Sequence, residues 1–171
     1  MRIAFTGPES SGKTTLSLWL ANELSGSTCV SEFAREYLEE KQLTRATEED
    51  FKQIASIQCD RFTQSTESIC QIFDTDIFVL RIWNDEVFKL KLPELEILAS
   101  YKMDIHFLCA PGVEWEADPL RSVPEETERT RLFENYKANL IEANSNFVVL
   151  NGSMDEKKSL ILASLPGFAL K

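Results

Sequence analysis

The stretch Gly7-Pro8-Glu9-Ser10-Ser11-Gly12-Lys13-Thr14 decides the fold of this chain, because it fits the pattern G-x-x-x-x-G-K-[ST]. It follows a short apolar run, residues 2–5, and precedes a segment, residues 14–24, whose leucines and tryptophan recur at helical spacing. Glycines let such a loop point successive backbone N–H groups inward at the start of a helix, which creates a nest for anions. The sequence therefore predicts a strand, a phosphate-binding loop and a helix, in that order.

The loop residues have separate expected roles. Lys13 would reach the β- and γ-phosphates of a nucleoside triphosphate, and the Thr14 hydroxyl would bind Mg²⁺. We expect ATP and Mg²⁺ as the cofactors. The other residues expected to surround the triphosphate are Gly7, Glu9, Ser10, Ser11, Gly12 and Thr15.

Strand-like and helix-like segments alternate along the whole chain. Such alternation predicts an α/β fold of three layers, with a parallel sheet covered by helices on both faces, in one domain spanning residues 1–171. The expected strands are 2–5, 28–31, 69–73, 105–109 and 147–151. The expected helices are 14–24, 47–67, 77–91, 126–143 and 155–164.

The composition excludes several kinds of partner. The 18 Lys and Arg residues against 28 Asp and Glu give a net charge of −10, which repels nucleic acid and anionic lipid. The glycine loop follows the first residues too closely for a signal peptide, and no apolar stretch approaches the roughly 18 residues that span a bilayer. We therefore expect a cytoplasmic protein that binds neither nucleic acid nor membranes.

The cysteines and the single histidine do not form a metal-binding pattern, because no two cysteines have CxxC spacing. We expect buried thiols, and His106 as a packing or edge residue in the strand 105–109. The cysteines are Cys29, Cys59, Cys70 and Cys109.

Acidic residues follow two of the expected strands. Asp74 ends an apolar strand, which is the Walker B arrangement, so we expect it to bind Mg²⁺. Asp76 could face a pocket for the acceptor of a phosphoryl group. Glu32, after the second strand, is the best candidate to orient or deprotonate an acceptor hydroxyl, and Asp74 and Asp76 stay open as alternative general bases. Arg35 could hold Glu32 or a substrate anion.

A polar stretch, residues 111–124, interrupts the alternation with three prolines and is too long for a tight turn. We interpret residues 111–128 as a lid. Its Arg121, together with Arg129 (or Arg131 in its place), could clamp a transferring phosphoryl group. Trp115 could close over the substrate.

These features favour a small-molecule kinase over other phosphate-loop proteins. A guanine-binding N-K-x-D sequence does not occur, and Asn151-Gly152-Ser153-Met154 follows the last strand. Gly152 is therefore expected near an adenine. The alternative is a regulatory module that binds or slowly hydrolyses ATP or GTP without a small-molecule acceptor. The base preference and the oligomeric state stay open.

Four segments together resemble the ribosylnicotinamide kinase domain of NadR-type proteins, a phosphate-loop kinase family. The loop 7–14 is similar to that family's G-x-E-S-S-G-K-[ST], and residues 32–37 (Glu-Phe-Ala-Arg-Glu-Tyr) to its E-[YF]-[GA]-R-E segment. Residues 73–76 (Phe-Asp-Thr-Asp) resemble its D-T-D strand end. Residues 114–122 resemble its E-W-x-x-D-x-L-R-S lid, with Arg129 at the matching spacing.

The resemblance implies a five-stranded sheet of the nucleoside-monophosphate-kinase type. It also implies transfer of a phosphoryl group from ATP to the ribose 5′-hydroxyl of nicotinamide riboside or a related nucleoside. One departure bears on the acceptor: Ser31 stands where the family has a tryptophan that can stack on the nicotinamide ring. Trp83 or Trp115 could supply a replacement ring.

Overall fold

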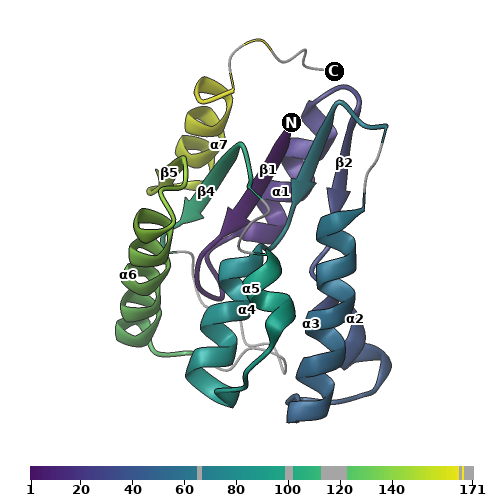
Figure 1. Ribbon diagram of the computed structural model, residues 1–171. Helices are drawn as coiled ribbons and strands as arrows, with labels where there is room; N and C mark the ends of the chain where they lie inside the picture. Colours follow the sequence, from purple (N-terminus) through teal and green to yellow (C-terminus); the bar gives the residue numbers. More distant parts are fainter. Residues whose placement is uncertain (65–66, 99–101, 113–122, 166, 168–171) are drawn as a thin grey trace.

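A five-stranded parallel sheet forms the centre of the molecule (Figure 1). The computed structural model describes residues 1–64, 67–98, 102–112, 123–165 and 167. The strands lie in the order β2-β3-β1-β4-β5, so β1 is central and flanked by β3 and β4. Their bounds are β1 (Arg2–Thr6), β2 (Ser27–Val30), β3 (Cys70–Phe73), β4 (Ile105–Cys109) and β5 (Phe147–Leu150). All five strands expected from the sequence are thereby confirmed.

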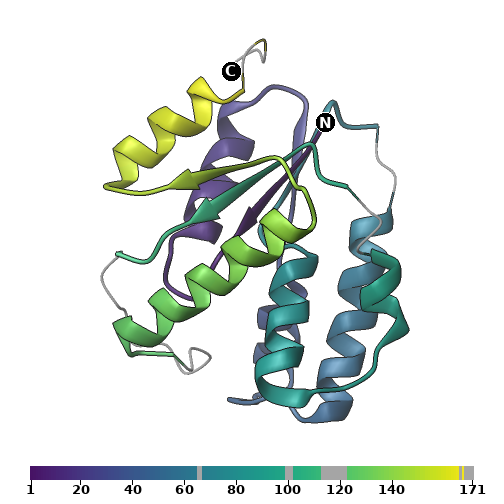
Figure 2. The same cartoon turned by 60° about the vertical axis from the view of Figure 1, so that its left-hand side comes forward.

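Helices cover both faces of the sheet, as the three-layer prediction requires (Figures 1 and 2). On one face, α1 (Lys13–Glu23) and α7 (Met154–Ala163) pack against alternate strand residues such as Ile3 and Phe5. On the other, α3 (Glu48–Thr63), α4 (Ile77–Trp83) and α6 (Glu126–Glu142) pack against residues such as Ala4. Because side chains alternate along a strand, neighbouring residues of β1 contribute to two separate cores.

The remaining helices extend the molecule beyond one end of the sheet. These are α2 (Phe33–Glu40) and α5 (Pro93–Leu98), which pack against α3. In Figure 1 the group α2–α5 lies below the sheet, on the side to which the strand arrowheads point. Ligands of open parallel sheets bind at this carboxyl end of the strands. The loops that follow β1, β2 and β3 are therefore the expected place of a ligand site.

The helix expected over residues 77–91 ends three residues early, and its last turn is π-helical. The helix α4 ends at Trp83 and continues as a π-helical turn, η1 (Asn84–Phe88), after which Lys89 adopts a left-handed backbone with φ +57°. The Asn84 side chain causes the stop, because it donates to the Leu90 carbonyl and accepts from the Leu90 N–H. An amide side chain that bonds the backbone in this way competes with helical hydrogen bonds.

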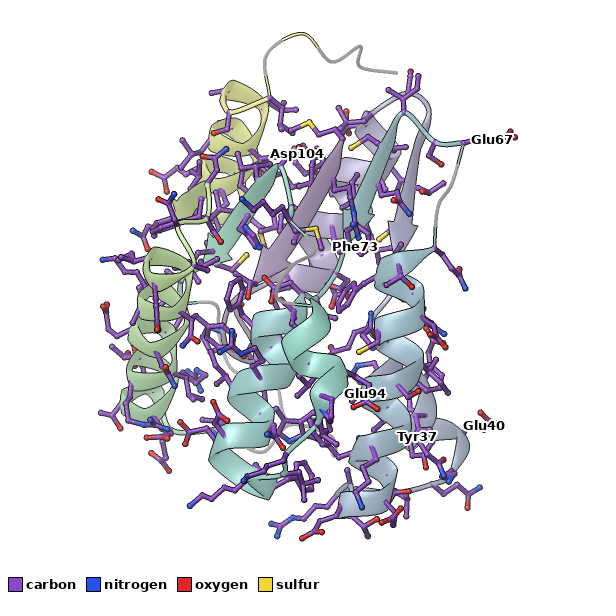
Figure 3. All side chains as sticks on the ribbon, viewed as in Figure 1. Tyr37, Glu40, Glu67, Phe73, Glu94 and Asp104 are labelled. Carbon is purple, nitrogen blue, oxygen red and sulfur yellow. The ribbon has the colours of Figure 1, made fainter. Side chains whose placement is uncertain are left out.

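The side chains are mostly apolar in the interior of this fold and mostly polar or charged at its surface, as three labelled residues illustrate (Figure 3). Phe73 lies fully buried between the sheet and the helices, whereas Glu40 and Glu67 project from the periphery. No helix within the described part of the chain is both long and apolar enough to cross a bilayer.

Candidate active site

The loop between β1 and α1 has the backbone that its sequence predicts. Gly7, Ser10 and Gly12 have positive φ angles of +130°, +53° and +88°. A Cβ on Gly7 would lie 2.6 Å from the carbonyl oxygen of Cys109, so only glycine fits there. The loop is thus pressed against the end of β4, and its left-handed residues turn the backbone as an anion nest requires.

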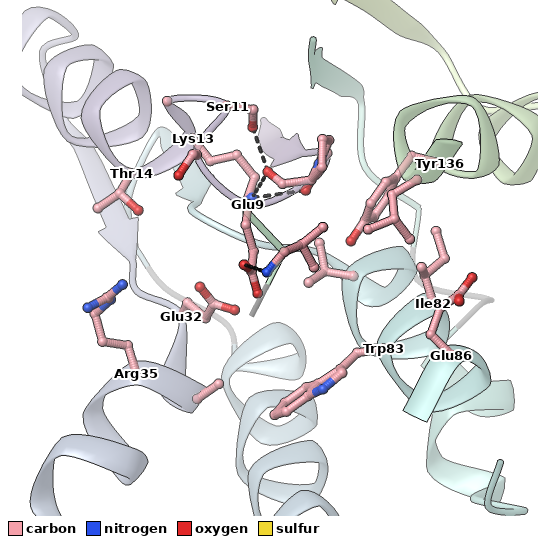
Figure 4. Close-up of a pocket in the computed structure, with 18 of the residues that line it drawn as sticks. Glu9, Ser11, Lys13, Thr14, Glu32, Arg35, Ile82, Trp83, Glu86 and Tyr136 are labelled. Atoms are coloured by element: carbon pink, nitrogen blue, oxygen red, sulfur yellow. Dashed lines mark hydrogen bonds between the residues drawn. The ribbon is translucent and has the colours of Figure 1, made fainter. Parts of the chain in front are cut away.

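Lys13 lies across this loop. Its ammonium donates to the carbonyl oxygens of Gly7 and Pro8 at 2.9 and 2.8 Å, and the Ser11 hydroxyl donates to the same Pro8 oxygen at 2.8 Å. These bonds hold the lysine charge and the loop backbone together above the pocket (Figure 4). In a chain with a net charge of −10 this local cation is needed to attract a polyphosphate.

The start of α1 is available to an anion. No described side chain caps the helix, and its first turn holds no acidic residue. By contrast, α3 begins with a capping box of Thr47 and Asp50, and α7 with one of Ser153 and Glu156. Uncapped N–H groups and the helix dipole both favour a phosphate at the start of α1.

Asp74 lies beside this helix start, at the end of β3. It is 5% exposed, and its Oδ1 has no hydrogen-bond partner among the described residues. Burial raises the pKa of Asp74, while the hydroxyls of Thr14 and Ser17 and the charge of Lys13 lower it. A buried carboxylate with an unused oxygen beside a threonine hydroxyl has the oxygen ligands that Mg²⁺ prefers. The residues expected to hold the metal are therefore brought together.

A buried lysine that the sequence analysis did not identify supports the loop from behind. Lys157 of α7 is 1% exposed, and its ammonium donates to the carbonyls of Ser11 and Ala110, each at 3.2 Å. Burial lowers the pKa of Lys157. The residue ties the phosphate loop to the end of β4. The sequence of α7 offers no signal for such a role.

A pocket of about 280 Å³ opens between this loop and the helices α2, α4 and α6 (Figure 4). The whole loop, residues 7–15, lines one side. Glu32 and Arg35, which precede and open α2, line the adjacent side, as expected. Burial raises the pKa of Glu32, against the opposing effect of Lys13. A raised pKa suits a carboxylate that accepts a proton.

The opposite end of the pocket is apolar and aromatic. Trp83 and Tyr136 lie there, together with Leu38, Val79, Ile82 and Leu132. The Trp83 ring is held edge-on by Phe51 and Phe88, with ring centroids 4.9 and 5.5 Å apart. Trp83 thus has one side packed in the core and another facing the pocket. Its sequence context, an apolar helix, does not distinguish these two roles.

Asp76 does not lie where the sequence suggested. It is fully buried, is not among the described residues that line the pocket, and caps α4 by accepting from the Val79 N–H and the Thr6 hydroxyl. Its second oxygen lies 3.5 Å from His106 Nε2. Burial raises the pKa of Asp76 and lowers that of His106. As an N-cap, the carboxylate satisfies helix N–H groups rather than an acceptor.

His106 packs as expected but is not at a sheet edge. It is 4% exposed, on β4 between β1 and β5, and its ring contacts Phe78 edge-on. The thiols of Cys59, Cys70 and Cys109 are buried and that of Cys29 is half-buried, and none of the four is in a disulfide. Burial raises the pKa of Cys59 and of Cys109 to about 12.

The end of the expected lid reaches the phosphate loop. The Val123 N–H donates to Glu9 Oε2 at 3.1 Å, and both residues line the pocket (Figure 4). Arg129 is 5% exposed and donates to the carbonyls of Val123 and Pro124, so it anchors this segment and is not among the described pocket-lining residues. Trp115 and Arg121 lie outside the described residues.

Two further candidates are not among the described residues that line the pocket. Arg131 forms ion pairs with Glu86 and Glu128, at 2.7 and 2.6 Å, on the surface. Gly152 turns the chain after β5 with φ +88°, where a Cβ would meet the Glu156 carboxylate at 2.5 Å. Its expected place beside an adenine stays a prediction.

The sheet order, the phosphate loop and the paired Thr14 and Asp74 define a phosphate-loop protein with the fold of nucleoside and nucleotide kinases. Residues 2–157 match the sequence profile of a family described as an AAA domain. The chain belongs to this family. A search of curated protein sequences found no match.

Solved structures share the fold at low sequence identity. A NadR protein in complex with NAD and AMP-PNP is 21% identical, with a TM-score of 0.69, over 95% of this chain and 48% of that one. A NadR protein in complex with NR is 23% identical, with the same TM-score, over 95% and 50%. This chain thus spans about half the length of the NadR chains.

Nucleoside and nucleotide kinases of similar length also share the fold. Deoxyadenosine kinase from M. mycoides with bound dCTP is 15% identical, with a TM-score of 0.66, over 96% of this chain and 98% of that one. Thymidylate kinase from Ehrlichia chaffeensis is 15% identical, with a TM-score of 0.60, over 96% and 97%. The expected α/β fold of the kinase type is confirmed.

Proposed function

We propose that this protein is an ATP-dependent kinase that phosphorylates the ribose 5′-hydroxyl of a nucleoside, with nicotinamide riboside as the favoured acceptor. One observation carries the proposal: a single pocket joins the phosphate loop, a half-buried carboxylate (Glu32) and an aromatic end that contains Trp83. A regulatory ATPase needs only the first of these three. A nucleoside kinase uses all of them, because a second substrate with a flat base must lie next to the nucleotide.

The residues present fit ATP and Mg²⁺. The loop 7–15 would surround the triphosphate, with Lys13 on its terminal phosphates and Glu9 connecting the loop to the end of the lid. Thr14 and Asp74 would hold Mg²⁺, which neutralises charge on the phosphate oxygens when it is bound. Trp115 and Arg121 would act from the lid. Arg129, on α6, would hold the end of the lid in place through its bonds to the Val123 and Pro124 carbonyls.

Glu32 would act on the acceptor. The carboxylate accepts the proton of the nucleoside hydroxyl as that oxygen bonds to the γ-phosphorus. The bond from the γ-phosphorus to the bridging oxygen breaks, and ADP leaves with the bonding electrons. Arg35 lines the pocket next to Glu32 and would favour its ionised form.

The aromatic end of the pocket favours a flat cationic or neutral base. Glu86 lies at this end and is paired with Arg131, so the Trp83 ring is the group left to contact the base. A tryptophan face attracts a cationic ring. The pyridinium ring of nicotinamide riboside carries a positive charge. Trp83 would supply the stacking ring that is missing at position 31, where this chain has Ser31.

Mass spectrometry of the purified protein with Mg²⁺, ATP and a panel of nucleosides tests the proposal. We expect nicotinamide riboside to gain one phosphate. Phosphorylation of another nucleoside instead would keep the kinase and contradict the acceptor. Nucleotide binding with no product from any acceptor would contradict the kinase and favour a regulatory module.

Replacement of Trp83 by leucine is expected to raise the acceptor KM roughly two- to twelvefold, because stacking contributes about 0.5–1.5 kcal/mol. The ATP KM should not change, since Trp83 does not belong to the phosphate loop. Steady-state kinetics with each substrate varied in turn measures both constants. The matched control is Trp19→Leu, because Trp19 packs in the other core, against α7. An equal rise of the acceptor KM in both variants would contradict a role of Trp83 in acceptor binding.

A further inference from the structure

Glu32 lies at an unusual position for a side chain that must face a pocket. It is the N-cap of α2, where a side chain normally turns back to accept from the first helical N–H groups. Within the described structure the Glu32 side chain makes no such cap bond. The first turn of α2 therefore needs an acceptor from elsewhere, because unpaired N–H groups are costly when they are buried.

Gln58 of α3 supplies that acceptor. Its Oε1 accepts from the Phe33 N–H at 2.7 Å, and its Nε2 lies 3.5 Å from the Ser31 carbonyl oxygen. Gln58 is 1% exposed, so water does not compete for these bonds. One amide side chain thus contacts the residues immediately before and after Glu32.

Arg61, one turn further along α3, bonds the same segment around Glu32 from its exposed side. Its guanidinium donates to the Ser31 carbonyl and hydroxyl at 3.4 and 3.0 Å, and to both Glu36 oxygens at 3.0 and 2.7 Å. It also lies over the Phe33 ring, 4.7 Å from the centroid. The Arg61 bonds lower the pKa of Glu36 to about 2, so Glu36 is ionised at neutral pH.

We infer that Gln58, assisted by Arg61, is a positioning residue that caps α2 in place of Glu32 and thereby leaves the Glu32 carboxylate free to face the acceptor. The inference rests on the proposed function, since it matters only if Glu32 acts on a hydroxyl. The helix α3 also carries Phe51, which holds the Trp83 ring. One helix therefore supports both the proton acceptor and the aromatic wall.

Gln58→Leu tests the inference, since leucine has a similar volume and can neither donate nor accept. We expect kcat for nucleoside phosphorylation to fall roughly tenfold, because a displaced carboxylate orients the hydroxyl poorly. The ATP KM should stay unchanged. Gln58→Glu, which keeps an oxygen to accept from Phe33, should recover most of kcat.

Three controls separate positioning from general damage. Gln53→Leu makes the same change on the same helix, where Gln53 contacts Tyr37 instead, and should leave kcat unchanged. If Gln58→Leu does not fold, as judged by its thermal unfolding, the surface variant Arg61→Met should show a smaller fall in kcat. In a Glu32→Gln background, Gln58→Leu should lower kcat no further, because the two residues act as a unit.

The outcomes distinguish the inference from the function. If Glu32→Gln lowers kcat and Gln58→Leu does not, the positioning role is overturned and the kinase stands. Equal losses from Gln58→Leu in both backgrounds would also overturn it, since that pattern indicates a general structural role. If the wild-type protein phosphorylates no nucleoside, the proposed function fails and the inference fails with it.

Discussion

Lys13→Ala is expected to lower phosphoryl transfer at least about a hundredfold, because removing one preorganised charge from a transition state costs that much. The Lys13 ammonium donates to the Gly7 and Pro8 carbonyls at 2.9 and 2.8 Å, at the loop where we propose that the nucleotide binds. Product formation followed by mass spectrometry measures the loss. The fold should persist, since Lys13 is a half-buried residue at the start of α1.

Lys52→Ala is the matched control for that variant. The substitution removes one lysine charge from α3, where Lys52 pairs with Glu49 on the surface. Full activity is expected for it. A Lys13→Ala protein that transfers phosphate at the wild-type rate would contradict the assignment of the loop as the nucleotide site.

Asp74→Asn is expected to lower transfer on the order of a hundredfold, because a metal that neutralises developing charge contributes several kcal/mol. The amide keeps the shape of Asp74 and loses its charge. Activity should recover partly at high Mg²⁺ concentration, since the defect lies in metal affinity. A titration of the rate with Mg²⁺ measures this. Asp60→Asn, on the exposed side of α3, is the control and should titrate like the wild type.

The same substitution should make the metal-free protein more stable at neutral pH. Burial raises the pKa of Asp74 above 3.8, so the folded state binds its proton more tightly than the unfolded state does. The unfolding free energy therefore falls as the pH rises through these two pKa values, and Asn avoids that loss. Denaturation in a chelator should show the gain at pH 7 and its disappearance in acid. A gain in unfolding free energy that persists in acid would contradict burial of the charged Asp74 carboxylate as its cause.

The fold and the phosphate side of the site could be predicted because their signals are local. Five apolar runs and one loop motif determine the strands, the turn and the start of α1. Thr47 before Glu48 and Asp50 predicts the start of α3, and the capping box is present. Each of these depends on residues a few positions apart, which a sequence shows directly.

The acceptor side could be predicted only in part, because its geometry depends on contacts between distant segments. Asp76 follows a strand end as Asp74 does, yet Asp74 lies beside the Thr14 hydroxyl whereas Asp76 caps α4. Gln58 lies 25 residues from Phe33, whose N–H it accepts. The end of the helix after Phe88 depends on the Asn84 side chain, which bonds the Leu90 backbone. Spacing alone does not reveal these pairs.

The buried ammonium of Lys157 has a consequence for the order in which the protein acquires its site. Its bond to the Ser11 carbonyl joins residues 146 positions apart. Contacts so distant in the chain form late in folding, and synthesis proceeds from the N-terminus. The phosphate loop is made well before α7 and gains this support only when α7 docks. A growing chain therefore carries its nucleotide-binding motif long before that motif has its final shape.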